Sequence, residues 1–134
     1  MIDFNKYIGI PWVCGKATME AADCWGLVSL VYKDLFNIEL SHFNVDKIDS
    51  ARKTSDTIEQ VQATTKRWKL SNEPKFGNVV MMIGRGSERP EHVGVFLGGG
   101  KVLHSLTRNN GVSSVHDVKI INRLFKRLEF YQYV

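Results

Sequence analysis

The sequence predicts an α+β protein, with helices in its first part and an antiparallel sheet in its second. Two observations predict this class. Apolar residues between positions 24 and 36 recur at three- and four-residue steps, the period of one buried helix face. After Pro74, short apolar segments alternate with turns rich in glycine or polar residues, which is typical of antiparallel strands. Helices followed by strands in this order favour an α+β arrangement.

Two helices are expected before Pro74. The first covers residues 24–36 and follows a loop over residues 9–23. Its apolar stripe consists of Leu27, Val28, Val31, Leu35 and Phe36. The second covers residues 56–68, where Asp56 and Glu59 have the spacing of a capping box.

Five strands are expected after Pro74. They cover residues 78–84, 92–97, 101–106, 111–116 and 124–133. The last segment is rich in aromatic and branched residues, and we expect it to close the sheet. The glycines of "LGGGKV" are expected in a hairpin turn, because valine follows the lysine where a phosphate-binding loop has serine or threonine.

Length and composition predict a single domain over residues 1–134. A chain of 134 residues is long enough to bury a core of its own, and 43% hydrophobic with 24% charged residues is ordinary for a globular protein. The net charge of +4 favours a solvated basic surface, with an anionic partner as the alternative. Because no run of five basic residues exists and aromatic residues do not interleave with basic ones, we expect no nucleic-acid partner.

No targeting or membrane segment is expected. The longest apolar runs are much shorter than a membrane span, so no membrane partner is predicted. The start, "MIDFNKYIGIPW", lacks the cationic end and apolar run of a secretory signal. We therefore expect synthesis in the cytoplasm, and an extracellular role would need another delivery route.

The two cysteines do not form a recognisable scaffold. Cys14 and Cys24 are too few for a disulfide framework, and their spacing is not that of a zinc site. A bridge between them is the alternative to the reduced state that we expect for a chain without a signal.

The strands around the three glycines predict that two histidines share one face of the sheet. With Gly98, Gly99 and Gly100 as the loop, Leu97 faces Lys101, Gly94 faces His104 and His92 faces Leu106. Side chains alternate across a sheet, so His92 and His104 become diagonal neighbours about 7–8 Å apart at the backbone. A register change of one residue would separate them.

Cys24, His92 and His104 have the chemistry of a nucleophile, its base and the group that orients the base. A cysteine at a helix N-terminus near an imidazole has its thiolate favoured by both the helix dipole and the charge. The N–H groups of that helix start are natural oxyanion donors. A second imidazole is able to fix the orientation of the first.

Simpler interpretations exist for each residue. Cys24 alone is more often a small buried hydrophobe, and a lone strand histidine is more often structural. Metal binding through Cys24, His92 and His104 is a further alternative, although their spacing is not typical of metal ligands, and we expect no cofactor. His42 and His116 have no comparable partners, so both are expected to be surface or structural residues.

The motifs resemble those of the NlpC-type papain-like cysteine peptidases of bacterial cell walls. The matching segments are "GIPWVCG", "ADCWGLVSLVY", "GNVVMM" and "HVGVFLGGGKVLHSL". The resemblance runs from about residue 7 to the end, with residues 40–70 the least characteristic. Tryptophan after the cysteine is most similar to the versions found in phage tail-tip assembly proteins.

The resemblance implies a hydrolase of peptidoglycan stem peptides, typically between D-glutamate and diaminopimelate or lysine. It implies that Cys24 is the nucleophile, His92 the general base and His104 the third residue. It also places Asp23 at the margin of the site, where relatives hold the free amine of the substrate. Capping of the following helix is the structural alternative for Asp23.

Two residues depart from the family pattern near the proposed substrate pocket. Trp25 replaces the usual serine after the cysteine, and Trp12 replaces a tyrosine and offers only an indole N–H. Trp25 either reshapes the pocket or packs the helix against the core. Both are predicted substrate-binding residues.

We therefore predict a cysteine endopeptidase with a stem peptide as substrate, carried in a virion tail and contacting other phage tail proteins. The alternatives are a catalytically silent tail-tip structural protein and a cell-wall amidase of similar architecture. A lipid-acting acyltransferase with a thiol nucleophile is disfavoured, because its relatives generally place the histidine before the cysteine.

Overall fold

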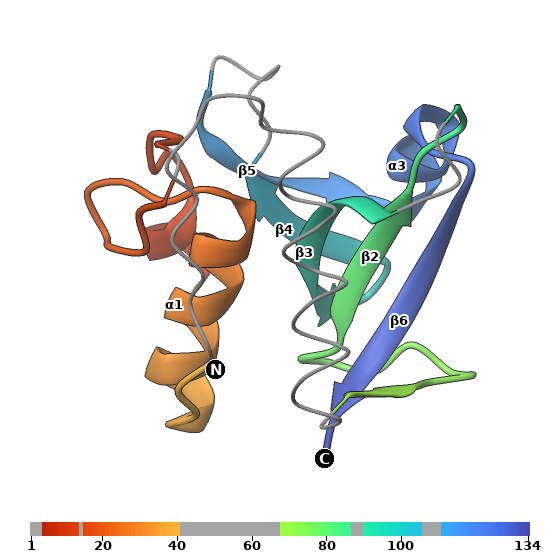
Figure 1. Cartoon of the computed structure of the whole chain (residues 1–134), viewed down its shortest axis with the longest axis horizontal. Helices are drawn as coiled ribbons and strands as arrows, with labels where there is room; N and C mark the ends of the chain where they lie inside the picture. The colour runs from red at the N-terminus through yellow and green to blue at the C-terminus, as the bar shows by residue number, and fades with distance from the viewer. Residues whose placement is uncertain (1–3, 14, 41–67, 87–89, 106–110) are drawn as a thin grey trace.

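The protein has a helix packed on a six-stranded antiparallel sheet, and the α+β prediction is confirmed (Figure 1). The computed structural model describes residues 4–13, 15–40, 68–86, 90–105 and 111–134. The described helices are η1 (Asn5–Tyr7), α1 (Cys24–Phe36) and α3 (Val118–Leu124). The strands are β1 (Trp68–Leu70), β2 (Val79–Ile83), β3 (Pro90–Gly98), β4 (Lys101–Ser105), β5 (Ser113–Asp117) and β6 (Arg127–Tyr133), in the order β1-β6-β2-β3-β4-β5.

Three details differ from the sequence-based expectations. Trp68 was expected to end a helix but begins the edge strand β1, and the rest of that helix lies outside the described residues. The final strand begins at residue 127 rather than 124, because the short helix α3 precedes it. This strand, β6, does not lie at an edge but pairs with both β1 and β2.

The boundaries of α1 agree with the predicted range, and local chemistry explains them. Oδ1 of Asp23 accepts a hydrogen bond from the backbone N–H of Gly26 at 2.7 Å, which caps the helix. At the other end, Asn37 adopts a left-handed conformation with φ of 55°, as is common where a helix stops.

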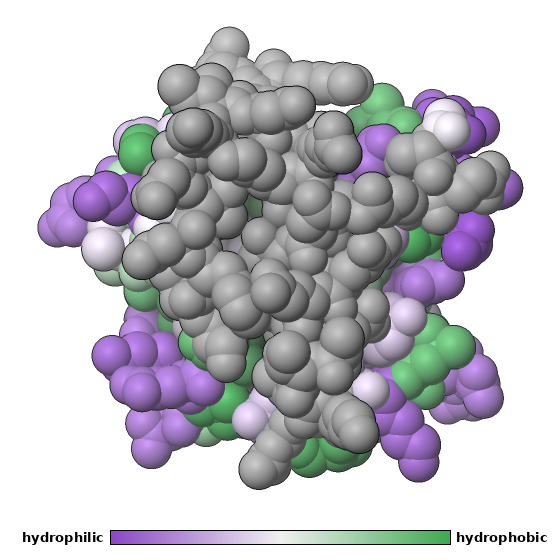
Figure 2. All heavy atoms as spheres, viewed as in Figure 1, coloured by the Kyte–Doolittle hydropathy of each residue, from purple (hydrophilic) through white to green (hydrophobic). Residues whose placement is uncertain are grey.

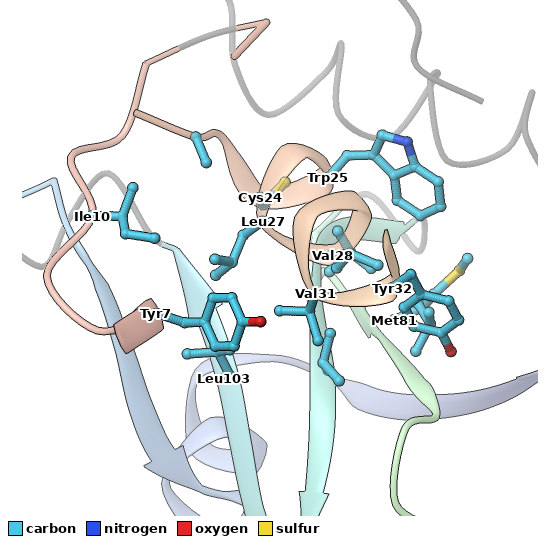
Figure 3. Close-up of a cluster of buried hydrophobic side chains, with 14 residues drawn as sticks. Tyr7, Ile10, Cys24, Trp25, Leu27, Val28, Val31, Tyr32, Met81 and Leu103 are labelled. Carbon is cyan, nitrogen blue, oxygen red and sulfur yellow. The ribbon is translucent and has the colours of Figure 1, made fainter. Parts of the chain in front are cut away.

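The two faces of the sheet bury different groups. We call the apolar residues beneath α1 the α1-side cluster; its buried members include Cys24, Trp25, Leu27, Val28, Val31, Val79, Met81, Val93, Val95 and Leu103 (Figure 3). We call the smaller group on the other face the α3-side cluster; its buried members are Val80, Met82, Phe96, Val102 and Ile121. Neighbouring residues of each strand therefore belong to opposite clusters, as the alternation of a pleated sheet requires.

The segment before α1 is tied to the start of β5. The hydroxyl of the buried Ser113 accepts from the backbone N–H of Ile10 at 2.9 Å and donates to the carbonyl of Tyr7. The backbone N–H of Ala22 donates to the carbonyl of Pro11 at 2.9 Å. Because Ser113 pairs with Ser105, these bonds hold the N-terminus of α1 at the end of the sheet where β4 finishes.

The outer surface is mixed in character. In the space-filling view, hydrophilic residues gather along both margins of the molecule, near α1 on one side and α3 on the other (Figure 2). Within the described parts of the chain, none of the helices has the length and apolar character needed to cross a membrane.

Candidate active site

Two predicted site residues, His92 and His104, meet on one face of the sheet. Strands β3 and β4 pair Gly94 with His104, as the predicted register requires. Nε2 of His92 and Nδ1 of His104 lie 3.0 Å apart, within hydrogen-bond distance. The prediction that these two imidazoles share a face is confirmed.

The turn of this hairpin differs in one detail. Lys101 pairs with Gly98 rather than with Leu97, and a bulge between Phe96 and Gly98 absorbs the extra residue. Gly98, Gly99 and Gly100 all have positive φ, a backbone region that favours glycine. The predicted partner of His92, Leu106, lies outside the described residues.

A third imidazole extends the pair, which the sequence-based interpretation missed. Nε2 of His104 lies 2.7 Å from Nδ1 of His116 on β5, so His116 does have a partner, contrary to expectation. His104 pairs with Gly94 on β3 and with Ser114 on β5. His92 lies two residues before Gly94 and His116 lies two residues after Ser114, so both are diagonal neighbours of His104, on opposite sides of it. We call these three side chains the imidazole row.

The inner end of the imidazole row is buried and electrically neutral. His92 is 5% exposed, and its ring stacks on Phe125 with 6.1 Å between the ring centres. Burial lowers the pKa of His92 well below its ordinary value, and the neighbouring His104 lowers it further. Burial and then His116 lower the pKa of His104 to about 4. Both inner rings are therefore uncharged near neutral pH.

Cys24 begins α1, as predicted, and is 2% exposed. Its side chain belongs to the α1-side cluster, and Figure 3 shows it on the first turn of the helix. The N-terminus of a helix carries a partial positive charge, so the start of α1 at Cys24 is a place where a developing negative charge is stabilised.

Cys24 and the imidazole row have different neighbours. The residues that follow His92 and precede His104 in sequence, Val93 and Leu103, face α1 and join the cluster of Cys24. The imidazoles instead face the side of Met82, the strand partner of His92. The structure thus brings the three histidines together and packs the cysteine within the other cluster.

Asp23 has a structural role in the loop before α1. In addition to the Oδ1 cap, its Oδ2 accepts a hydrogen bond from the backbone N–H of Gly15 at 2.7 Å. A Cβ atom added at Gly26 would lie 1.9 Å from the carbonyl oxygen of Lys16. The loop therefore approaches the helix so closely that only glycine fits there.

The two tryptophans occupy different environments. Trp25 is 4% exposed, and its ring meets Trp68 edge-on with 6.4 Å between centres. Trp12 is half-buried in the loop, and its backbone N–H donates to the carbonyl of Gly111. Packing thus accounts for the position of Trp25, while substrate binding by Trp12, Trp25 and Asp23 stays a prediction. Cys14 and His42 lie outside the described residues.

Metal ligation was the alternative use of the histidines. In the described residues, no group of three or more His, Cys, Asp or Glu side chains is arranged to hold a metal ion. Four of the six ring nitrogens in the imidazole row are engaged in its two internal hydrogen bonds.

The helix-on-sheet architecture and the histidines on adjacent strands define an α+β protein of the papain-like fold. The model of the NlpC/P60 family matches residues 9–128. The chain belongs to this family.

Solved structures of the same family have the same fold. The NlpC/p60 domain of the peptidoglycan hydrolase SagA is 21% identical with a TM-score of 0.61, over 96% of this chain and 91% of that chain. NlpC2 from Trichomonas vaginalis is 19% identical with a TM-score of 0.58, over 95% of this chain and 42% of that one. An NLP/P60-family protein similar to a lipoprotein, from Staphylococcus aureus, is 20% identical with a TM-score of 0.56, over 92% and 37%. This chain thus spans less than half the length of the last two. No protein with a curated description matches the sequence at a significant level.

Proposed function

We propose that the protein is a cysteine peptidase that hydrolyses stem peptides of bacterial peptidoglycan, cleaving between D-glutamate and diaminopimelate. Membership of the NlpC/P60 family and the similarity to a domain of a peptidoglycan hydrolase support the class of reaction. The observation that carries the proposal is the hydrogen bond between His92 and His104. It engages Nε2 of His92 and leaves Nδ1 as the nitrogen for a thiol proton.

In the proposed reaction, Nδ1 of His92 takes the proton of Cys24 and the sulfur attacks the scissile carbonyl. The new C–S bond gives an acyl-enzyme, and the leaving amine takes the proton back from His92. Water, deprotonated by His92, then releases the acid product and restores the thiol. This scheme requires Sγ of Cys24 to come within hydrogen-bond distance of Nδ1 of His92 when substrate binds. Catalytic hydrogen bonds are often longer in the absence of substrate and tighten in the complex.

The proposal includes delivery by a phage or prophage tail, where the protein would contact other tail proteins. It rests on the tryptophan after Cys24, which is similar to that of phage tail-tip assembly proteins. Isolation of virions followed by immunodetection of the protein in purified tails tests this part separately from catalysis.

The test of activity is digestion of purified peptidoglycan by the protein and by Cys24→Ala, with products identified by mass spectrometry. Ser29→Ala is the matched control, since Ser29 lies on the same helix and its hydroxyl donates to the carbonyl of Trp25. We expect new amino groups on diaminopimelate from the unmodified protein and from Ser29→Ala, and none from Cys24→Ala. New amino termini at other bonds would replace the proposed specificity with that of an amidase or another peptidase.

A catalytically silent tail component is the second candidate, and the burial of Cys24 in the α1-side cluster is the observation that favours it. The rate of Cys24 alkylation as a function of pH distinguishes the two. An activated thiol reacts well below the ordinary thiol pKa of about 8.5 and loses this reactivity in His92→Ala. A profile that His92→Ala leaves unchanged, together with identical digests from the protein and Cys24→Ala, would establish the silent candidate.

A further inference from the structure

We infer that His116 is a positioning residue that determines, through His104, which ring nitrogen of His92 carries a proton. The inference rests on the proposed function, because His92 acts as a base only when its Nδ1 is bare. It assigns a role to a residue on β5 that has no part in the reaction scheme above.

The geometry of the imidazole row permits only two arrangements of protons when all three rings are neutral. Each neutral ring carries one N–H, and each of the two contacts needs one donor and one acceptor. If His104 donates from Nε2, then His92 must donate from its own Nε2 and His116 must accept at Nδ1. If His104 donates from Nδ1, the protons lie on Nδ1 of all three rings. The three tautomers therefore change together.

Only the first arrangement provides a base. With all protons on Nε2, Nδ1 of His92 is bare and accepts a proton from a thiol. With all protons on Nδ1, that nitrogen is already a donor. A proton bound by His116 gives this ring N–H groups at both positions, so its Nδ1 donates to His104 and imposes the second arrangement. A proton on His116 of β5 thus removes the proton acceptor at Nδ1 of His92 on β3.

The same row moves charge away from the buried rings. When Nδ1 of His92 takes the thiol proton, its Nε2 proton passes to Nδ1 of His104, and the Nε2 proton of His104 passes to Nδ1 of His116. The atoms balance: one proton leaves sulfur, and one positive charge arrives at His116. Burial makes a charge unfavourable at His92 and His104, whereas His116 is only half-buried.

Asp117, whose charge interacts with the outer ring, is itself linked to charged groups on two further elements. Asp117, next to His116 on β5, forms an ion pair of 2.7 Å with Lys101 of β4. Lys101 and then Lys119 of α3 lower the pKa of Asp117, and His116 contributes in the same direction. The carboxylate of Asp117 attracts a positive charge on His116, and the two lysines repel it.

The first test reads tautomers directly, by nitrogen NMR of the ring atoms in protein labelled at histidine. Between about pH 8 and about pH 5, we expect His92 and His104 to change together from Nε2–H to Nδ1–H. In His116→Asn, whose amide occupies the place of Nδ1 but does not titrate, the change should be absent. A tautomer of His92 that is constant with pH, or that still switches in His116→Asn, would overturn the inference.

Asp117→Asn is the second variant, and it decides the question if His116→Asn does not fold. It removes the negative charge next to His116 and weakens the ion pair with Lys101, while the three imidazoles themselves are unchanged. Because the negative charge beside His116 is removed, we expect the tautomer changes of His92 and of His104 to move to lower pH by the same amount. Movement of one without the other would contradict the coupling.

The second test is kinetic and separates this inference from the proposed function. His116→Ala should lower kcat/KM by roughly 10–100-fold, the usual cost of removing an orienting partner. His116→Asn should instead retain activity at pH 8 and shift the acidic limb of the pH–rate profile to lower pH. If the unmodified protein cleaves no peptidoglycan, the proposed function fails while the NMR result still stands. If it cleaves and both variants have its profile, the inference fails alone.

Discussion

The face of the sheet under α1 and the face toward α3 are stabilised in different ways. Under α1 the buried groups are aliphatic and aromatic, and the helix is positioned by packing and by the two hydrogen bonds of Asp23. Toward α3 a smaller apolar cluster lies beside three imidazoles. A buried polar group is costly unless it is hydrogen-bonded, and the imidazole row meets this requirement for its inner rings.

This difference shows which changes each face tolerates. The α1 side is sensitive to volume, because the loop and helix approach within contact distance at Gly26. The α3 side is sensitive to charge, because a proton on His92 or His104 would place a cation in a buried site. A variant that adds a methyl group should therefore destabilise the α1 side, and a pH that adds a proton should destabilise the α3 side.

The largest effect is expected from Gly26→Ala, which breaks the α1 side. The new Cβ would lie 1.9 Å from the carbonyl oxygen of Lys16 and 2.9 Å from Oδ1 of Asp23, so backbone must move. We expect a loss of about 3–4 kcal/mol in the free energy of unfolding, measured by urea denaturation. Gly86→Ala is the matched control, since a Cβ there meets nothing within 4 Å. Similar losses in both variants would show that the close approach is unimportant.

Acidification should produce the next largest effect, and it acts on the α3 side. The pKa of His104 is about 4 in the folded protein and 6.5 when exposed, so between these values the unfolded chain binds more protons. The free energy of unfolding therefore rises with pH in this window, and roughly 3 kcal/mol is lost as the pH falls from 6.5 to 4. His92 adds to the loss in the same direction.

Urea denaturation at several pH values between 7 and 5 measures this dependence while most carboxylates stay ionised. His104→Asn removes one titrating ring and should reduce the slope. Because this variant also breaks the imidazole row, the comparison uses the slope and not the absolute stability. A slope that is unchanged in His104→Asn would assign the pH dependence to groups other than this ring.

Local patterns predicted α1 and the register at His92 and His104, since both depend on residues close together in sequence. The role of His116 was not predictable, because it depends on the register between β4 and β5. The number of residues between the two strands does not determine that register. The helix α3 is short and buries only Ile121 among its residues, so it leaves no periodic pattern. Its formation depends on contacts made by the folded sheet.

The position of Cys24 relative to the imidazoles was also beyond the local pattern. Strand β3 is buried on both faces from His92 to Phe96, so its sequence does not show which side α1 covers. The residues flanking the histidines, Val93 and Leu103, are as apolar as those of the opposite cluster. Which face receives the helix is decided by the whole set of packing contacts.

The smallest effect is expected from Asp23→Asn, which sharpens the comparison by testing the α1 side without changing its volume. An asparagine retains one oxygen acceptor for Gly26 but presents an amide where Oδ2 accepts from Gly15. We expect a loss of about 1 kcal/mol in the free energy of unfolding. Asp34→Asn is the control, because Asp34 is exposed on the same helix and accepts a hydrogen bond from the hydroxyl of Tyr7. In the digestion assay, a higher KM for stem peptides with a free amine in Asp23→Asn alone would add substrate binding to capping. An unchanged KM would restrict Asp23 to holding the loop against the helix, and the proposed peptidase would then have to bind that amine elsewhere.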